Sequence, residues 1–216
     1  MRGWKVASAA LVAIALIVAP SVASPSVRSC THGYTYAGLA SQAGTEGVAA
    51  TVSAFRAPAV YTGHAAAWVG VGGFHQGLGG ANEWIQVGLA AFPRDGLHIY
   101  VEEVSRGQAR HFVDLGRAVP GRRYHVRVVE TGRDVWRAYI DGRAAGTPAY
   151  LPTAGGAWRG VATAESWAAG RASCNRFAYR FDSVAVRHGA GWAALANAER
   201  VGAAVTARPR GFVAAY

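Results

Sequence analysis

Two short segments decide the fold class: Ala67-Trp68-Val69-Gly70-Val71-Gly72-Gly73 and, after a loop, Glu83-Trp84-Ile85-Gln86-Val87-Gly88-Leu89. In both, tryptophan, glycine or a polar residue recurs at every second position between aliphatic residues. Successive side chains of a strand point to opposite faces of a sheet, so Trp84, Gln86 and Gly88 share one face and the aliphatic residues fill the other. A glutamine in such a strand either satisfies its amide within the fold or presents it to a ligand.

The same alternation continues through most of the chain and predicts eight or more strands with no helical pattern between them. The predicted strands are Val48–Phe55, His64–Val71, Glu83–Phe92, Leu97–Val104, Arg110–Leu115, Arg123–Glu130, Val135–Gly142, Ala157–Glu165 and Phe177–Val186. Thr31–Gly44 is an N-terminal strand or an irregular clip. Many short strands separated by turns are typical of a β-sandwich.

The two ends of the chain differ from this middle part. Arg2 and Lys5 precede an uncharged apolar run from Val6 to Val18, and small residues follow up to Ala23. This pattern predicts a secretory signal peptide at 1–23, which is too short to span a membrane, and a secreted, extracellular protein. We expect one sandwich domain at 24–190 and a C-terminal extension at 191–216 that packs on it or trails from it. Within the extension, Ala193–Val205 is a short helix or a loop, and Gly211–Ala214 is a final short strand.

Cysteine count and charge narrow the chemistry. Cys30 and Cys174 are the only two cysteines, and an even count in an exported protein predicts a disulfide bond between them. The chain has 22 basic and 12 acidic residues, and Lys5 is its only lysine, so no lysine chemistry is available after the leader. The arginines are spread singly along the strands rather than in blocks, which indicates a solvated surface and no nucleic-acid partner.

The paired segments resemble a known family. Ala67–Gly72, a loop and then Ile85-Gln86-Val87-Gly88 are similar to the strand pair of the fungal glutamic peptidases, the eqolisins (peptidase family G1). Ile99–Val104 falls where that family has an aromatic strand, and Thr163-Ala164-Glu165-Ser166-Trp167 resembles the segment that carries its catalytic glutamate. The resemblance extends from about residue 45 to 185. It implies an antiparallel, concanavalin A-like jelly-roll β-sandwich in one domain.

The resemblance also implies a catalytic pair. Glu165 would be the general base that activates water and then the acid that protonates the leaving amine. Gln86 would orient the water and stabilise the oxyanion. Trp68, Trp84, Tyr100 and Glu102 would shape the substrate site. The implied protein is a monomeric endopeptidase without a cofactor that acts on polypeptides.

The chain departs from the family in three respects. Tyr100 is the only aromatic residue left in the 99–104 strand, and Ser166 stands directly after the glutamate where the family has tryptophan. The chain is also basic, whereas family members are generally acidic. Taken singly, Gln86 fits an amide bonded to the backbone, and Glu165 fits a solvated or arginine-paired carboxylate.

A second hypothesis belongs to another class: a non-catalytic, lectin-like module that binds extracellular or cell-wall polysaccharide through aromatic side chains. A third is a surface protein whose sandwich is only a scaffold. The seven histidines lack metal-ligand spacing, so we expect no metal site. The chain has no G-x-S-x-G motif, which argues against a serine hydrolase of the α/β type.

Overall fold

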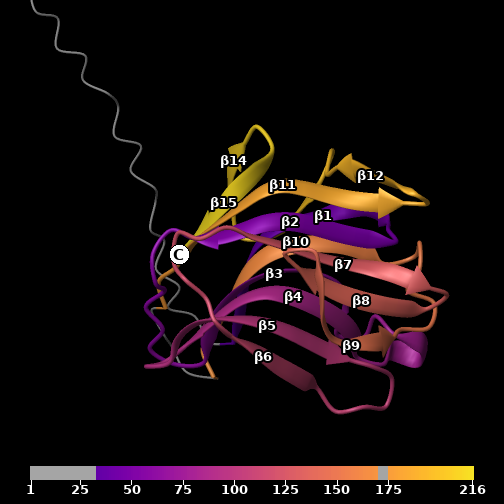
Figure 1. Ribbon diagram of the computed structural model, residues 1–216, viewed down its shortest axis with the longest axis horizontal. Coiled ribbons are helices and arrows are strands. Elements are labelled where there is room, and N and C mark those ends of the chain that lie inside the picture. Colours follow the sequence, from indigo (N-terminus) through magenta and orange to yellow (C-terminus); the bar gives the residue numbers. More distant parts are fainter. Residues whose placement is uncertain (1–32, 170–174) are drawn as a thin grey trace, which may run out of the picture.

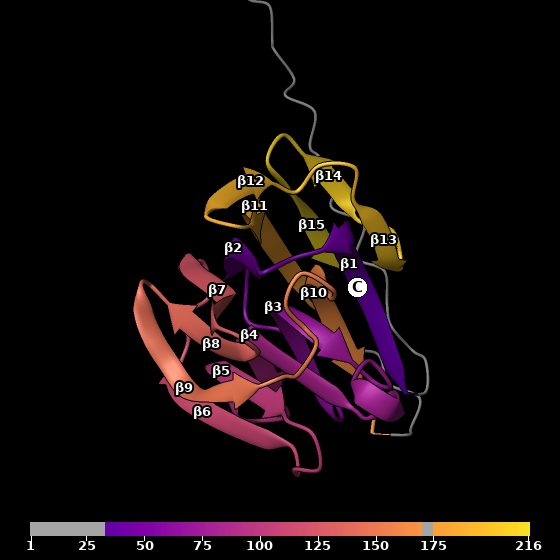
Figure 2. The ribbon, with the colours of Figure 1, turned by 90° about the vertical axis from the view of Figure 1, so that its right-hand side faces the viewer.

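The computed structural model describes residues 33–169 and 175–216, and within them the chain forms two stacked antiparallel sheets (Figures 1 and 2). The seven-stranded sheet has the order β13-β1-β10-β3-β4-β5-β6, and the eight-stranded sheet has the order β14-β15-β11-β2-β7-β8-β9. β12 also pairs with β11, outside the main strand order of the eight-stranded sheet. The predicted β-sandwich is confirmed.

The strands follow one another along the chain with short connections. The first eight are β1 (Tyr34–Gly44), β2 (Gly47–Ala54), β3 (His64–Gly73), β4 (Glu83–Phe92), β5 (Gly96–Val104), β6 (His111–Arg117), β7 (Tyr124–Gly132) and β8 (Val135–Ile140). The remainder are β9 (Arg143–Tyr150), β10 (Arg159–Trp167), β11 (Ala178–His188), β12 (Gly191–Ala194), β13 (Glu199–Gly202), β14 (Thr206–Arg208) and β15 (Gly211–Ala215). A 3₁₀ turn at Leu78–Gly80 lies in the loop between β3 and β4.

The core lies between the two sheets and consists of the aliphatic positions of each alternating strand. The seven-stranded sheet contributes Val69, Ile85, Val87 and Leu89, all fully buried. The facing sheet contributes larger side chains, including Trp136, Tyr179 and Phe181. Burial of each such side chain stabilises the fold by about 1.5–3 kcal/mol. This core fixes the register, because a shift of one residue would turn every aliphatic side chain outward.

Two parts of the chain differ from the sequence-based expectation. The structure adds a strand, β9, at the end of the eight-stranded sheet; Pro148 within it is tolerated because an edge strand need not donate every backbone hydrogen bond. The expected helix or loop at Ala193–Val205 is wrong in part, since this segment contains the end of β12 and all of β13. Pairing of β13 with the edge of β1 outweighs the helical preference of the alanines elsewhere in Ala193–Val205.

C-terminal strands form one edge of each sheet: β13 in the seven-stranded sheet and β14 in the eight-stranded sheet. β15 lies between β11 and β14, and Tyr216 exchanges two backbone hydrogen bonds with Phe177. The expected final strand at Gly211–Ala214 is therefore present as β15. Residues 1–23, Cys30 and Cys174, and with them the predicted leader and disulfide, lie outside the described residues. No helix among the described residues is long and apolar enough to cross a membrane.

Candidate active site

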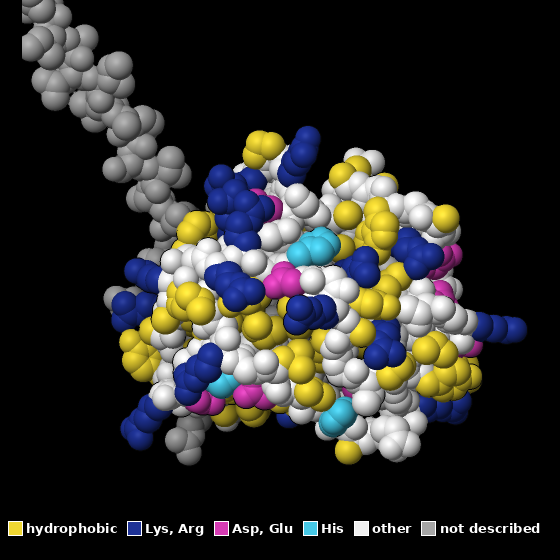
Figure 3. Space-filling model, in the orientation of Figure 1, with side chains coloured by type: hydrophobic (Ala, Val, Ile, Leu, Met, Phe, Trp, Pro, Cys, Tyr) yellow, Lys and Arg dark blue, Asp and Glu magenta, His cyan; other side chains and the backbone are white. Residues whose placement is uncertain are grey.

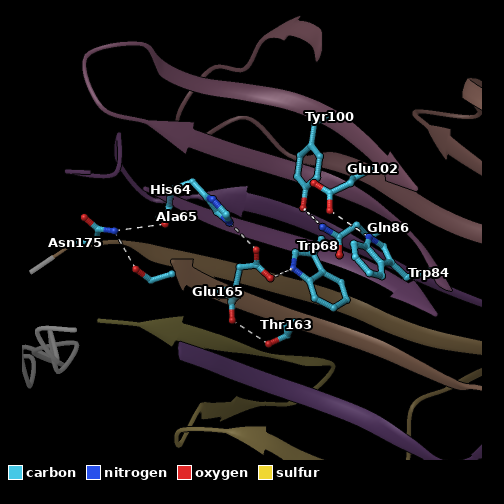
Figure 4. Close-up of polar contacts among 12 residues, drawn as sticks. His64, Ala65, Trp68, Trp84, Gln86, Tyr100, Glu102, Thr163, Glu165 and Asn175 are labelled. Atoms are coloured by element: carbon cyan, nitrogen blue, oxygen red, sulfur yellow. Dashed lines mark hydrogen bonds and ion pairs between the residues drawn. The ribbon is translucent and has the colours of Figure 1, made fainter. Parts of the chain in front are cut away.

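The predicted site residues lie on the outer face of the seven-stranded sheet, the face turned away from the core (Figure 4). Four adjacent strands carry them in the order β10, β3, β4 and β5. Glu165 comes from β10, Trp68 from β3, Trp84 and Gln86 from β4, and Tyr100 and Glu102 from β5. Each has at least one buried aliphatic neighbour in sequence, so the packing of the core orients the whole set outward.

Glycines between these side chains permit the close approach of β3 and β4 beneath the site. Gly88 is the cross-strand partner of Trp68, and a Cβ atom on Gly88 would lie 2.7 Å from the Trp68 Cα. Gly70 is the partner of Gln86, and its Cβ would lie 2.9 Å from the Gln86 Cβ. Real Cβ atoms do not approach so closely. Backbone oxygens would be closer still to both Cβ atoms, at 2.6 Å for Gly70 and nearer for Gly88, so glycine at both positions is what allows the two strands to pack under the site.

The Glu165 carboxylate is the centre of the site. Only 6% of the residue is exposed, and both carboxylate oxygens are held. The Trp68 Nε1 donates to Oε2 at 2.9 Å, and His64 Nε2 lies 2.7 Å from Oε1 (Figure 4). Such contacts at both oxygens fix the orientation of a buried carboxyl group. Taken singly, the sequence suggested a solvated or arginine-paired carboxylate at this position. The structure shows neither: Glu165 is buried and its partners are Trp68 and His64.

His64 is the residue that sequence reasoning missed. It begins β3 on the same face as Trp68, and the period of two that grouped Trp84 with Gln86 also groups these two. Its ring lies among the aromatic rings of Tyr34, Phe92 and Trp167, with centroid distances of 5.7–6.3 Å. These neighbours hold the imidazole against Glu165 and keep it from turning into solvent.

Gln86 is hydrogen bonded on the other side of Trp68. Its Nε2 donates to the Tyr100 hydroxyl at 3.0 Å, and the residue is 8% exposed. Burial, with the nearby charges of Glu165 and Glu102, holds the pKa of Tyr100 well above its usual value, so the phenol stays protonated. Figure 4 shows the Trp68 side chain between Glu165 and Gln86.

Glu102 carries a second, half-buried carboxyl group, in register opposite Gln86. Trp84 Nε1 donates to its Oε1 at 3.1 Å. Burial raises the pKa of Glu102, the charge of Glu165 raises that pKa further, and the charge of Arg110 and the Trp84 hydrogen bond oppose the rise. Glu102 therefore holds its proton to a higher pH than an ordinary glutamate.

Two cavities meet at this group of residues, and Gln86, Glu102 and Glu165 line both of them. The first has a volume of about 220 Å³ and is walled mainly by aromatic side chains: Tyr34, Tyr36, Trp68, Phe74 and Trp84. The second, of about 280 Å³, is lined by His64, Ala90, Phe92, Phe112 and Arg110, among others. An extended ligand that crosses the three polar residues would place side chains in both cavities.

Ser166 and Asn175 support the end of β10 nearest His64. The Asn175 amide donates to Ser166 Oγ at 3.0 Å and to the Thr62 carbonyl at 3.0 Å. Its Oδ1 accepts from the Tyr61 backbone at 2.9 Å. Asn175 thereby ties the segment before His64 to β10 (Figure 4). Ser166, which departs from the family pattern, takes part in this tie.

Comparisons with known proteins agree with this architecture. The crystal structure of scytalido-glutamic peptidase with a transition state analog inhibitor superposes with a TM-score of 0.61 at 14% identity, over 85% of this chain and 98% of that one. SCP-B, a member of the eqolisin family of peptidases in complex with the tripeptide Ala-Ile-His, gives 0.57 at 13% identity over 86% and 98%. The chain has the fold of the glutamic peptidases.

Other comparisons add little. A carbohydrate-binding module from Bacillus subtilis, CBM66, gives a TM-score of only 0.40 at 15% identity, over 71% of this chain and 81% of that one, which is too low to carry an argument. No protein-family model matches the sequence, and no curated protein sequence does either. No group of three or more metal-ligating side chains occurs within residues 33–169 and 175–216.

Proposed function

We propose that this chain is an endopeptidase that hydrolyses peptide bonds with Glu165 and Gln86. One observation carries the proposal: a buried carboxyl group, held at both oxygens, lines the same two cavities as a buried amide on the outer face of this sheet. The similarity of the fold to glutamic peptidases supports it. As part of the same proposal, the chain acts outside the cell, because residues 1–23 have the pattern of an export signal.

The proposed reaction uses a water molecule in the cleft that Glu165 and Gln86 both line. The Glu165 carboxylate takes a proton from this water as its oxygen bonds to the carbonyl carbon of the substrate. The Gln86 amide donates a hydrogen bond to the oxyanion that forms. Glu165 then gives its proton to the amide nitrogen, the C–N bond breaks, and an acid and an amine leave. No cofactor takes part in these steps.

The contacts of Glu165 suit this role. Trp68 and His64 hold the carboxyl group in one orientation, and a fixed base avoids the cost of reorganisation during each proton transfer. The polypeptide would lie across Gln86, Glu102 and Glu165, with one side chain in the aromatic cavity and a neighbouring one in the cavity that contains Arg110.

The test is hydrolysis of an unfolded protein from pH 2 to 8 by the purified chain, with Glu165→Gln and Gln86→Ala beside it. Loss of a general base lowers rates by about 10²–10⁴-fold. We expect both variants to lose cleavage while keeping the thermal unfolding of the wild type. Glu199→Gln and Gln42→Ala are matched controls, since both residues are exposed. Equal cleavage by Glu165→Gln would contradict the proposal.

Polysaccharide binding in the same cleft is the second candidate. Tyr34 stacks on Tyr36 with 5.8 Å between ring centroids, Phe74 packs against Trp84 at 5.4 Å, and Tyr34 and Phe74 are exposed. Such rings offer flat apolar faces beside polar groups, as a sugar requires. This candidate predicts glycan binding that Glu165→Gln leaves intact and Tyr34→Ala abolishes, with no cleavage of protein by the wild type.

A further inference from the structure

The outer face of the eight-stranded sheet, on the opposite side of the molecule from the cleft, carries a group of arginines that we call the arginine face. Its members are Arg123, which directly precedes β7, Arg127 of β7, Arg137 of β8, and Arg180 and Arg187 of β11. Figure 3 views the molecule from this side and shows many basic side chains and few acidic ones. Lys5 is the only lysine and lies outside the described residues, so every basic side chain of this face is an arginine.

Register brings these separate residues together. β2 lies between β11 and β7, and its outward side chains are small: Gly47, Ala49, Thr51 and Ser53. Arg187 lies opposite Gly47, Arg180 opposite Ser53, and Arg127 opposite Ala49 from the other side. Adjacent strands are about 4.8 Å apart, so two lines of arginine flank a shallow floor about 10 Å wide. Single arginines in the sequence thus form one surface.

The charge of this surface is only partly neutralised. Asp182 is the single acidic side chain that faces outward from β2, β7, β8 and β11, all of which lie in the described part of the chain. Its carboxylate pairs with Arg180 at 2.8 Å and with Arg123 at 3.5 Å. Two of the five guanidinium groups therefore share the one carboxylate. Within the ranges that the structure describes, Arg127, Arg137 and Arg187 have no acidic partner on this face.

The guanidinium groups are also held in place. Arg127 stacks over the Tyr139 ring at 4.3 Å, and Arg187 donates to the carbonyls of Gly189 at 2.8 Å and Glu130 at 3.2 Å. Preorganised side chains lose less conformational entropy when they bind. A guanidinium binds a carboxylate or sulfate through two parallel hydrogen bonds. These features distinguish the surface from scattered, freely moving surface charges.

We propose that the arginine face binds a linear anionic polysaccharide, independently of the cleft. An acidic polymer matches the excess of positive charge, and its charged groups at successive sugars suit two rows of guanidinium groups. Trp192 lies opposite Arg187 at one end of the face and is 41% exposed, which offers an apolar surface to a sugar ring. A single-stranded nucleic acid fits less well, because successive bases need several open aromatic faces in a row, and Arg127 covers the Tyr139 ring beside the two lines of arginine.

The experiment measures binding of polygalacturonate to the full chain as a function of salt, with uncharged dextran and a single-stranded oligonucleotide beside it. We expect binding of polygalacturonate that weakens linearly on a log–log plot against salt concentration, and no binding of dextran. Arg127→Gln/Arg137→Gln should weaken binding by about tenfold or more and lower the salt slope by about one to two. Arg127→Lys/Arg137→Lys keeps the charge and should recover most of the slope.

Arg94→Gln/Arg200→Gln is the matched control, since both arginines belong to the seven-stranded side of the molecule. It should change the affinity less than twofold. The proposal is overturned if polygalacturonate does not bind, if the control weakens binding as much as the test pair, or if the oligonucleotide binds more tightly. Cleavage activity of the arginine variants, measured in parallel, should equal that of the wild type, which separates this proposal from the proposed peptidase.

Discussion

The outer faces of the two sheets differ in how they treat charge. On the seven-stranded sheet, Glu165 is buried and Glu102 half-buried beside aromatic side chains, and indole or imidazole groups hold their oxygens. On the eight-stranded sheet, the arginines flank a floor of small side chains and are half-buried or exposed. The strands of both sheets have the same alternation of inward and outward side chains, so the fold alone does not explain why the two outer faces differ. The residue types at the outward positions create a cleft with two carboxyl groups on one face and an arginine-rich surface on the other.

The largest effect should come from replacing one carboxylate on each face with the corresponding amide. Glu165→Gln should lower kcat/KM for an unfolded protein by about 10³-fold or more, because it removes the general base. Asp182→Asn, on the arginine face, should leave cleavage unchanged and should strengthen polygalacturonate binding, since it removes the one carboxylate that competes there. Assays of both activities on both variants check this. Loss of cleavage in Asp182→Asn would show that the two faces are not independent.

Removal of the imidazole should have the next largest effect. His64→Ala leaves Glu165 Oε1 without its 2.7 Å partner, and we expect kcat to fall by about 10–100-fold with little change in KM. His64→Gln can still donate a hydrogen bond and should recover part of the loss. Steady-state kinetics of the two variants separates positioning from binding. A rise in KM with an unchanged kcat would instead assign His64 to substrate binding.

A smaller effect is expected at the other oxygen of Glu165. Trp68→Phe keeps an aromatic ring but removes the Nε1 donor at 2.9 Å. We expect a fall in kcat of about tenfold and a loss of unfolding free energy of about 0.5–1.5 kcal/mol. Chemical denaturation and kinetics on the same preparation measure both. A loss of stability with unchanged kcat would mean that the hydrogen bond supports the fold alone.

The last effect concerns stability and not catalysis, and it arises at Glu83, at the start of β4 beside the cleft. Its carboxylate is buried, and neither oxygen has a hydrogen-bond partner within the described part of the chain. Burial raises the pKa of Glu83 above 4.5, and the charge of Arg106 opposes the rise. Because the pKa of Glu83 is higher in the folded protein than in the unfolded chain, protonation of Glu83 favours folding. This contribution to stability is complete below pH 4.5 and is lost as the pH rises through the folded-state pKa of Glu83.

Glu83→Gln mimics the protonated form and tests this directly. The variant should equal the wild type below pH 4.5 and should be more stable at pH 7 by about 1–3 kcal/mol. Urea unfolding at the two pH values measures the difference. Asp182→Asn is the contrast, because that carboxylate is ion-paired and its loss should not stabilise the fold. A Glu83→Gln variant less stable at pH 7 than the wild type would show that the carboxylate has a favourable partner.

The sequence predicted the parts of the molecule that depend on the period of two. Trp84, Gln86 and Gly88 share a face, and the strands from His64 to Val104 lie within a few residues of their expected positions. Register across strands was not visible. The arginines therefore looked isolated, and His64 carried no signal beyond its shared face with Trp68. β9 was missed because Gly146 and Pro148 break the strand pattern, and an edge position permits both.

The most direct test of the central claim is binding of a peptide in which a tetrahedral hydroxymethylene group replaces the scissile amide. An enzyme that stabilises a tetrahedral intermediate binds such a compound at least about 10²-fold more tightly than the parent peptide. The account predicts tight binding to the wild type by calorimetry, loss of this advantage in Gln86→Ala, and no change in Arg127→Gln/Arg137→Gln. Equal affinity for both peptides, or an advantage that survives Gln86→Ala, would contradict the assignment of the cleft as a peptidase site.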